Sequence, residues 1–352
     1  MHFGSDNQTG ASEKVLQKVL EANRGVTAGY GDDLWSQRAV EALRQMFACD
    51  LDAHFVPTGT AANGLALGSL VQPFESILCH NQAHLLTSEG SAPEYLTGGA
   101  RLIGISRGEA KLRPEHLDQH FRQMGHGHDH NTPPKALSVA QVAENGLVYS
   151  PAELKALCES AHRFGLRVHL DGARFANAVA ALGCHPGDIS WRAGVDVLSL
   201  GATKNGALAA EAVVFFQRGS GDDFQRRRKR AGHTVSKGRL FGAQFLGWLE
   251  ENHWLELASH ANQMACKLGQ ALQSIPDIRL VFPVMANELL LIMPRSMADR
   301  LAAAGARFFE WYVESLPAEI RLREDEAYIR LVTSFCTTAA EIEEFRQVAA
   351  GA

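Results

Sequence analysis

The sequence predicts an α/β protein with a large, doubly wound, mostly parallel sheet and a smaller C-terminal α+β part. Two observations carry this prediction. Up to Phe216, short apolar runs alternate with longer stretches of helical periodicity, which is the pattern of βαβ units. After Phe216, a long helical stretch and shorter strand candidates follow instead. With 352 residues, 46% of them hydrophobic, the chain is long enough to bury two cores.

The apolar runs of the first part are expected to form strands. They cover residues 53–57, 76–79, 101–105, 136–141, 167–170, 196–200 and 212–216. Helical periodicity is found between them at residues 61–71, 89–97, 114–124 and 152–164. Ligands of such sheets bind beyond the carboxyl ends of the strands, so we expect chemically active residues directly after these runs.

The pattern divides the chain into three parts. Residues 1–28 are expected to form an arm and a helix at 13–23, with Ser12 as N-cap, that join the small domain. Residues 29–245 are expected to form the large domain and residues 246–352 the small one. From residue 237 on we expect a helical stretch at 237–272, strands at 279–282, 288–293 and 329–333, and a terminal helix at 339–349.

Composition argues against several classes of protein. The formal net charge of −5 gives no reason to expect a nucleic-acid partner. Six scattered cysteines without a CxxC pair indicate neither a disulfide framework nor a zinc ribbon, and they suit a reducing compartment. The first residues lack the pattern of a signal peptide, and no run of about 18 apolar residues predicts a membrane span. We therefore expect a cytoplasmic protein.

Two charged residues stand directly after apolar strand candidates. Lys204 follows the run that ends at Leu200, and Asp171 follows the run that ends at Leu170. A lysine against a dry sheet edge is a nucleophile suited to a Schiff base with a carbonyl. A buried carboxylate needs a cationic partner, and a protonated pyridine nitrogen is one. Together they predict a pyridoxal 5′-phosphate (PLP) site, although an N-cap or an ion pair with Arg174 would also explain Asp171.

The segment Pro57-Thr58-Gly59-Thr60 follows a strand and opens a helix. The backbone amides at Gly59 and Thr60 could bind a phosphate at the positive end of that helix, although an ordinary capped helix start has the same composition. The segment has neither a Gly-Lys-Ser/Thr ending nor a GxGxxG motif, so a nucleotide is not supported. Arg174 carries a planar fork that suits a carboxylate, the alternative being a surface arginine.

Histidines and a basic run give weaker signals. The segment from His80 to His84 follows a strand, and either ring could stack on a cofactor or carry a proton. A loop with histidines at 126, 128 and 130 suggests a metal site, an exposed flexible loop or one active-site histidine; its alternating spacing disfavours the metal. The basic residues 226–230 either form a solvated helix face or contact a phosphate that is held by a neighbouring subunit.

A set of motifs in fixed order resembles a known family. The motifs are Ser5-Asp6-Asn7, Tyr30-Gly31-Asp32-Asp33, Pro57-Thr58-Gly59-Thr60-Ala61-Ala62-Asn63, His169-Leu170-Asp171-Gly172-Ala173-Arg174, Thr203-Lys204-Asn205-Gly206 and Arg330-Leu331-Val332-Thr333. Over nearly the whole chain they are similar to the low-specificity L-threonine aldolases, including phenylserine aldolases. The resemblance implies PLP fold type I, the aspartate aminotransferase fold: a large domain with a mostly parallel seven-stranded sheet plus a smaller α+β domain.

The resemblance also implies roles for single residues. Lys204 would bind the cofactor covalently, and Asp171 would bind its pyridine nitrogen. Gly59 and Thr60 would hold the phosphate, with Arg230 of a partner subunit as the basic residue that helps. His84 would stack on the ring and serve as base or position a water that does.

The substrate side of the site follows from the same resemblance. Ser5, Arg174 and Arg330 would hold the substrate carboxylate, and Arg174 would also contact the cofactor. Tyr30 would lie near the site across a subunit interface. A second histidine, His130 or else His128, would contact the substrate hydroxyl region. No metal is implied.

The expected reaction is retro-aldol cleavage of L-threonine, L-allo-threonine and bulkier substrates such as phenylserine into glycine and an aldehyde. The expected assembly is a homo-oligomer, a tetramer built from dimers with shared active sites. Two departures from relatives, the run from Ala140 to Gly146 and Asn205 after the lysine, leave substrate range and stereochemistry open. A β-elimination lyase, an aminotransferase and a non-catalytic PLP-binding protein are the alternatives.

Overall fold

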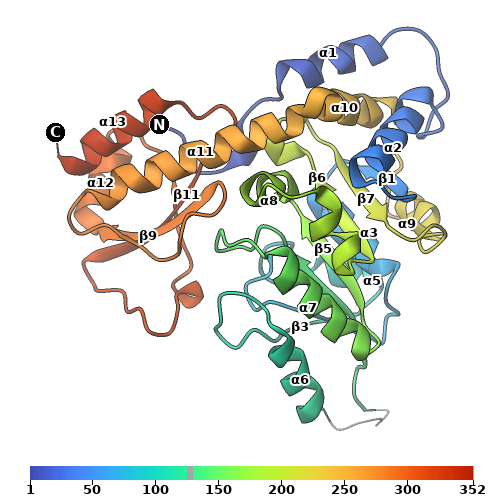
Figure 1. Cartoon of the computed structure of the whole chain (residues 1–352), viewed down its shortest axis with the longest axis horizontal. Helices are drawn as coiled ribbons and strands as arrows, with labels where there is room; N and C mark the ends of the chain where they lie inside the picture. The colour runs from blue at the N-terminus through green and yellow to red at the C-terminus, as the bar shows by residue number, and fades with distance from the viewer. Residues whose placement is uncertain (125–129, 352) are drawn as a thin grey trace.

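The computed structural model describes residues 1–124 and 130–351 and contains two sheets, each with its own layer of helices (Figure 1). The large sheet has seven strands in the order β1-β7-β6-β5-β4-β2-β3. Its strands are β1 (Asp52–Val56), β2 (Ser76–Cys79), β3 (Arg101–Gly104), β4 (Pro134–Ala140), β5 (Arg167–Gly172), β6 (Val197–Gly201) and β7 (Glu211–Phe215). All neighbours pair in parallel except β7, which runs antiparallel to β1 and β6. The mostly parallel α/β sheet predicted from the sequence is confirmed.

Helices cover both faces of this sheet and form what we call the large lobe. Successive strand residues point to opposite faces, so Val197 and Leu198 of β6 belong to different cores. Val197 packs with Ala61 and other residues of α3, whereas Leu198 packs with Phe175 of α8 and with α7. The helices here are α3 (Gly59–Gly68), α4 (His84–Thr87), α5 (Ala92–Thr97), α6 (Pro114–Gln123), α7 (Pro151–Arg163), α8 (Phe175–Leu182) and α9 (Phe224–Arg230).

The second sheet lies at the other end of the molecule and forms the small lobe (Figure 1). It is antiparallel with the order β10-β11-β9-β8. Its elements are β8 (Arg279–Leu280), β9 (Glu288–Pro294), α12 (Arg295–Ala303), β10 (Phe309–Glu310), β11 (Glu326–Val332) and α13 (Ala339–Ala350). The start of the chain joins this lobe, because Phe3 is bonded through its backbone to Arg307 and Val332 and is buried against Phe345.

The stretch expected as one helix at 237–272 is two helices, α10 (Arg239–Leu249) and α11 (His253–Gln273). Glu251 and Asn252 break the helix with left-handed φ values of 53° and 60°. Periodicity does not reveal this break, because both segments are amphipathic and no proline or glycine separates them. The break lets α10 pack on α1 (Glu13–Ala22) and α2 (Leu34–Phe47), while α11 runs on to the small lobe (Figure 1).

The N-cap prediction for the first helix is right in position only. Ser12 is the N-cap of α1, but its side chain makes no capping hydrogen bond. Its Oγ lies 3.1 Å from Nε2 of His253, so the hydroxyl ties α1 to α11 instead.

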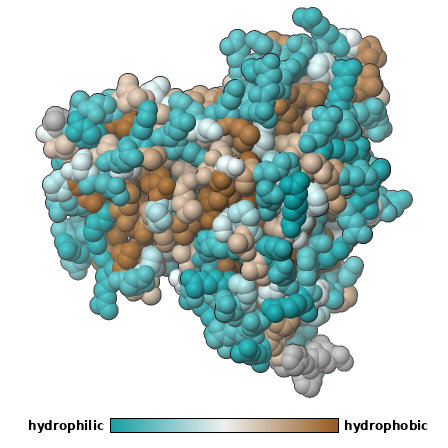
Figure 2. Space-filling view, in the orientation of Figure 1, coloured by the Kyte–Doolittle hydropathy of each residue, from teal (hydrophilic) through white to brown (hydrophobic). Residues whose placement is uncertain are grey.

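Figure 2 shows polar side chains over most of one face of the molecule, with apolar side chains gathered mainly around and below α11. Among the described residues, none of the helices combines the length and the apolar character needed to span a bilayer.

Candidate active site

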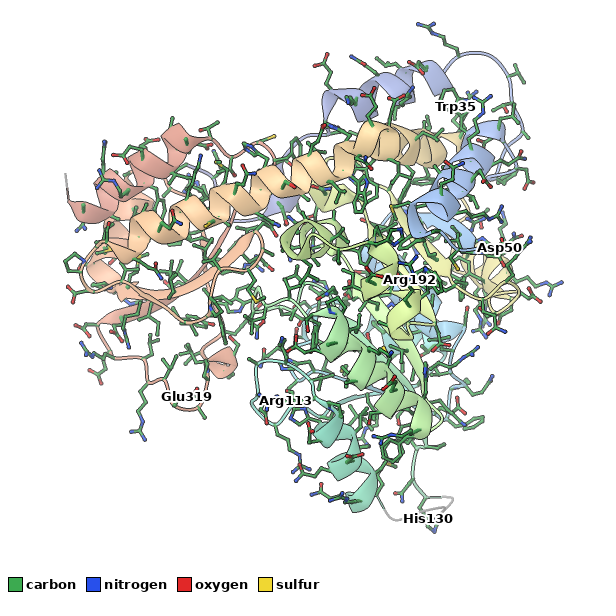
Figure 3. All side chains as sticks on the ribbon, in the orientation of Figure 1. Trp35, Asp50, Arg113, His130, Arg192 and Glu319 are labelled. Carbon is green, nitrogen blue, oxygen red and sulfur yellow. The ribbon has the colours of Figure 1, made fainter. Side chains whose placement is uncertain are left out.

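A cavity of about 1210 Å³ lies between the two lobes at the carboxyl ends of the parallel strands. Both lobes contribute to its wall; Figure 3 labels Arg113 from the large lobe and Glu319 from the small lobe, and both line it. Many of the residues singled out from the sequence line it too: Ser5, Gly59, Thr60, His84, Asp171, Arg174, Lys204 and Arg330. The fold thus brings residues from both ends of the chain to the place where ligands of such sheets bind.

A chain of hydrogen bonds leads from Asp171 to His84. Asp171 is a buried residue near the carboxyl end of β5, and its Oδ1 accepts from the backbone of Ala173 at 3.0 Å. Its Oδ2 accepts from Nδ2 of Asn63 at 2.9 Å, and the same Nδ2 donates to Oε1 of Glu89 at 2.9 Å. Oε1 of Glu89 lies 2.8 Å from Nδ1 of His84. This hydrogen bond raises the pKa of His84 above its ordinary value, against the opposing effect of burial.

Lys204 lies in a single 3₁₀ turn, Thr203–Asn205, directly after β6. Within the described part of the chain, its amine has neither a hydrogen bond nor an ion pair, and it faces the cavity. Nearby, Glu211 at the start of β7 accepts from the backbone of Ala202 at 3.0 Å. Burial raises the pKa of Glu211 to about 7. The lysine is therefore free to react with a carbonyl group.

The start of α3 provides a seat for an anion. Thr58 is the N-cap, and its Oγ1 accepts from the backbone of Ala61 at 3.2 Å. The preceding amides, of Gly59 and Thr60, are the first of the helix and have no partner within it. A side chain at Gly59 would meet nothing within 4 Å, so there is open space beside the backbone. Helix dipole, free amides and open space together suit a phosphate.

Two arginines and two carboxylates form a cluster, of which Arg174, Arg330 and Glu288 line the cavity. Arg174 donates to Asp6 through Nε at 2.7 Å and Nη2 at 2.9 Å. Its Nη1 lies 3.2 Å from Oε2 of Glu288, whose Oε1 lies 3.8 Å from Nη1 of Arg330. The guanidinium of Arg330 stacks on Trp311, 4.0 Å from the ring centre. Ser5, the N-cap of the short turn that carries Asp6, lines the cavity beside this cluster.

Three predicted residues lie elsewhere. Tyr30 is exposed, with Nζ of Lys229 5.3 Å from its ring centre, and Arg230 is exposed at the end of α9; neither lines the cavity of its own chain. His130 is exposed in the loop before β4, at the amino ends of the parallel strands and so remote from the cavity (Figure 3). His128, and with it the metal interpretation of that loop, falls outside the described residues. Of the histidine candidates named from the sequence that the structure describes, His80 and His84 line the cavity, and His84 is the one hydrogen-bonded to Glu89.

Sequence reasoning assigned no role to several polar residues of the cavity wall: Asn63, Glu89, Glu144, Glu211 and Glu288. Oε1 of Glu144 accepts from the backbone of His84 at 2.9 Å, and burial raises the pKa of Glu144 to about 7. Glu211 and Glu288 could have been noticed, because each is an acid at the start of an apolar run. Glu89, expected from the sequence at the start of a helix over 89–97, gives no such signal, and the structure places it before α5.

The donors and acceptors of the cavity fit PLP together with an amino acid. A carboxylate at Asp171, an unpaired amine at Lys204 and an open helix N-terminus at Gly59 match the pyridine nitrogen, the aldehyde and the phosphate. Nε of Arg330 is buried without a hydrogen-bond partner, so one guanidinium donor remains for a substrate carboxylate. The fold and this set of groups define a PLP-dependent enzyme of fold type I.

Comparisons with known proteins agree with this class. A family model described as "Beta-eliminating lyase" matches residues 2–294. The low-specificity L-threonine aldolase of Pseudomonas aeruginosa is 40% identical over 94% of this chain and 97% of its own length; that of a second Pseudomonas strain is 39% identical over 94% and 98%. The solved structure of Leishmania major threonine aldolase superposes with a TM-score of 0.91 at 27% identity, covering 99% of this chain and 98% of that one.

The chain belongs to the beta-eliminating lyase family and, among its members, to the low-specificity L-threonine aldolases. The resemblance drawn from the motifs is thereby confirmed, as are the fold type and the PLP cofactor. Sphingomonas wittichii serine palmitoyltransferase, with a TM-score of 0.73 at 14% identity, shares the fold alone.

Proposed function

We propose that this chain is a PLP-dependent aldolase that cleaves L-threonine and L-allo-threonine to glycine and an aldehyde by breaking the Cα–Cβ bond. The relatives named above support the reaction. The observation that carries the proposal is that one cavity is lined by Lys204, Asp171 and both arginines of the cluster. An amine, an acid and two guanidinium groups are the chemistry needed to hold PLP and an amino acid side by side.

Three groups would hold the cofactor. The Lys204 amine would bind its aldehyde covalently, the Asp171 carboxylate would keep its pyridine nitrogen protonated, and the amides of Gly59 and Thr60 would bind its phosphate. When bound, PLP supplies an electron sink for the pair of electrons left on Cα. Asn63 holds Asp171 in place, because its amide donates to the carboxylate at 2.9 Å.

The substrate carboxylate would bind at Ser5, Arg174 and Arg330, and this fixes which bond is broken. A carboxylate held by guanidinium groups sets the rotation about Cα, so that the Cα–Cβ bond, rather than the bond to hydrogen or to the carboxylate, faces the electron sink. The stack of Arg330 on Trp311 limits the positions that its guanidinium can adopt. The orientation of the substrate would therefore be set by side chains whose own positions are restricted by their neighbours.

His84 would take the proton of the β-hydroxyl group. Glu89 holds Nδ1 at 2.8 Å, which leaves Nε2 as the nitrogen that can accept a proton from substrate or from a water. Glu144 keeps the start of α4 at the cavity, because it accepts from the backbone of His84 at 2.9 Å. The histidine is thus positioned through its ring and through its backbone.

We further propose a homo-oligomer with shared active sites, arranged as a tetramer built from dimers. Tyr30 and Arg230 support this proposal, since both are exposed and outside the cavity of their own chain. A partner subunit would bring them to the neighbouring site, where Arg230 would add charge beside the phosphate. The cytoplasmic location and the use of phenylserine remain predictions.

The test is a product assay with L-threonine, L-allo-threonine and phenylserine. Glycine and an aldehyde in equal amounts support the aldolase, whereas ammonia and a keto acid would show the β-elimination that the family description names. Lys204→Ala is the control, and we expect it to lose both turnover and the visible absorbance of covalently held cofactor.

A further inference from the structure

The seat expected for the substrate carboxylate already contains a carboxylate of the protein. Glu288 is the first residue of β9, and its side chain is 1% exposed although the residue lines the cavity. It lies between the two arginines, 3.2 Å from Nη1 of Arg174 and 3.8 Å from Nη1 of Arg330. An α-carboxylate clamped by the same two nitrogens would have to occupy the same space.

The charges of the cluster are balanced without substrate. Two guanidinium groups, of Arg174 and Arg330, face two carboxylates, of Asp6 and Glu288. A further carboxylate would leave one negative charge without a partner in a poorly solvated place, which is unfavourable. The negative charge of one of the two acids therefore opposes the binding of the substrate carboxylate.

Of the two acids, Glu288 is the one that a substrate carboxylate can displace. Asp6 accepts two hydrogen bonds from Arg174 and a third from Asn287 at 3.0 Å, and it does not line the cavity. Both carboxylate oxygens of Glu288, by contrast, are buried without a hydrogen-bond partner among the described residues. Glu288 is held by charge at 3.2 and 3.8 Å alone.

The hydrogen-bond donors of the two arginines support the same conclusion. Arg174 uses Nε and Nη2 on Asp6, so Nη1, which faces Glu288, is the one left. Arg330 donates through Nη2 to the backbone oxygen of Gly4 at 3.3 Å, and its Nη1 also faces Glu288. A substrate carboxylate must take over these two donors from Glu288, with Nε of Arg330 as an additional one.

We propose that Glu288 is a specificity-determining residue that occupies the carboxylate seat and competes with the substrate carboxylate for Arg174 and Arg330. The proposal rests on the aldolase function above and deepens it. Glu288 weakens the binding of α-carboxylates and makes the seat tolerant of a neutral group such as a carboxamide, whose N–H can donate to it.

The test measures dissociation constants of glycine by titration calorimetry on the PLP-loaded enzyme, together with KM and kcat for L-threonine. In Glu288→Gln we expect glycine to bind about tenfold more tightly and KM to fall by a similar factor. Asp6→Asn is the comparison on the other side of Arg174: it also removes a charge but disturbs the two hydrogen bonds that hold the guanidinium, so glycine should gain less there than in Glu288→Gln. If Glu288 merely held the arginines in place, Glu288→Gln would weaken the binding of glycine, and that result overturns the proposal.

A second measurement needs no variant. In the unmodified enzyme, the preference for glycine over glycinamide should be smaller than about tenfold, because Glu288 repels the carboxylate and accepts from the amide. A larger preference overturns the proposal even if Glu288→Gln fails to fold. The aldolase function is tested separately, since glycine formation from threonine by the unmodified enzyme does not depend on either result.

Discussion

Arg174 donates two hydrogen bonds to Asp6, a residue 168 positions earlier in the chain, at 2.7 and 2.9 Å. The pair joins the end of β5 to the N-terminal segment, whose Phe3 is buried in the small lobe. Asn287, just before β9, donates to the same aspartate at 3.0 Å. One buried carboxylate therefore links the two lobes beside the cavity.

The first prediction concerns the stability that this carboxylate provides. Asp6→Asn keeps the shape of the side chain but removes its charge, which leaves Arg174 with Glu288 as its ion-pair partner among the described residues. Losing one member of a buried, hydrogen-bonded ion pair should lower the free energy of unfolding by ~3 kcal/mol. Urea unfolding followed by circular dichroism measures this. Asp188→Asn, at an exposed pair with Arg192 at 2.9 Å, should change it little; equal effects of the two substitutions would refute the prediction.

The second prediction concerns the pH dependence of the stabilisation that Asp6 provides. Burial acts to raise the pKa of Asp6, but the charges of Arg174 and Lys204 and the hydrogen bonds outweigh it, so the pKa lies below its ordinary value. A lowered pKa in the folded state means that the stabilisation is fully present above the unfolded value, about 3.9, and is lost as the pH falls through the folded value. The difference in unfolding free energy between the unmodified protein and Asp6→Asn should be constant from about pH 5 to pH 7 and shrink below about pH 4. A difference that grows on acidification would contradict it.

The sequence predicted elements well where the signal is local. The run Ser76-Ile77-Leu78-Cys79 is apolar, short and flanked by polar residues, and the structure forms β2 at these four positions. The sequence did not predict the break between α10 and α11, because Glu251 and Asn252 adopt left-handed backbone angles that no glycine marks. Nor did it predict β10, whose two residues form a strand only because β11 lies beside them.

The candidate site also contains residues that the sequence predicted and residues that it did not. Lys204 and Asp171 could be predicted because each follows a buried strand, and the end of a parallel strand is where such sheets bind ligands. Asn63 gains its role from Asp171, 108 positions away, and Glu288 gains its role from Arg330 of another strand. The sequence marks Glu288 as an acid at the start of an apolar run, but which partners these two residues meet is a property of the folded chain.

The third prediction concerns the pair of His84 and Glu89. The hydrogen bond that His84 donates to Glu89 raises the pKa of His84. A general base works only in its neutral form, so the rate should rise as the pH passes upward through that pKa. Glu89→Gln removes the charge and should move the acidic limb of the kcat/KM profile for L-threonine to lower pH. Glu256→Gln, at His253 and outside the cavity, is the matched control.

An acidic limb that stays in place in Glu89→Gln would show that His84 is not the titrating base. In that case, replacement of His84 itself by asparagine should cost far less than the ~10²-fold loss of kcat expected for a general base.

The fourth prediction concerns the support of Asp171. Asn63→Ala removes the amide that donates to Oδ2 of Asp171 and to Glu89, both at 2.9 Å. A lost hydrogen bond to a buried charged group should weaken PLP binding by about tenfold. Fluorescence titration of the cofactor-free protein with PLP measures this. Asn262→Ala, which removes two hydrogen bonds with Asn177 away from the cavity, should leave the cofactor affinity unchanged.

The last prediction tests whether the sites are shared between subunits. If Arg230 serves the phosphate of a partner's site, Arg230→Ala and Lys204→Ala place their defects in complementary positions. Each variant alone should be nearly inactive or bind PLP weakly, but a mixed dimer contains one site in which Lys204 of one subunit meets Arg230 of the other, both intact. Mixing the two variants under conditions that exchange subunits should therefore restore glycine formation well above that of either variant alone. If Arg230 instead served its own chain, or only covered the surface of α9, mixing would restore nothing, because every site would carry a defect of its own or none would depend on Arg230.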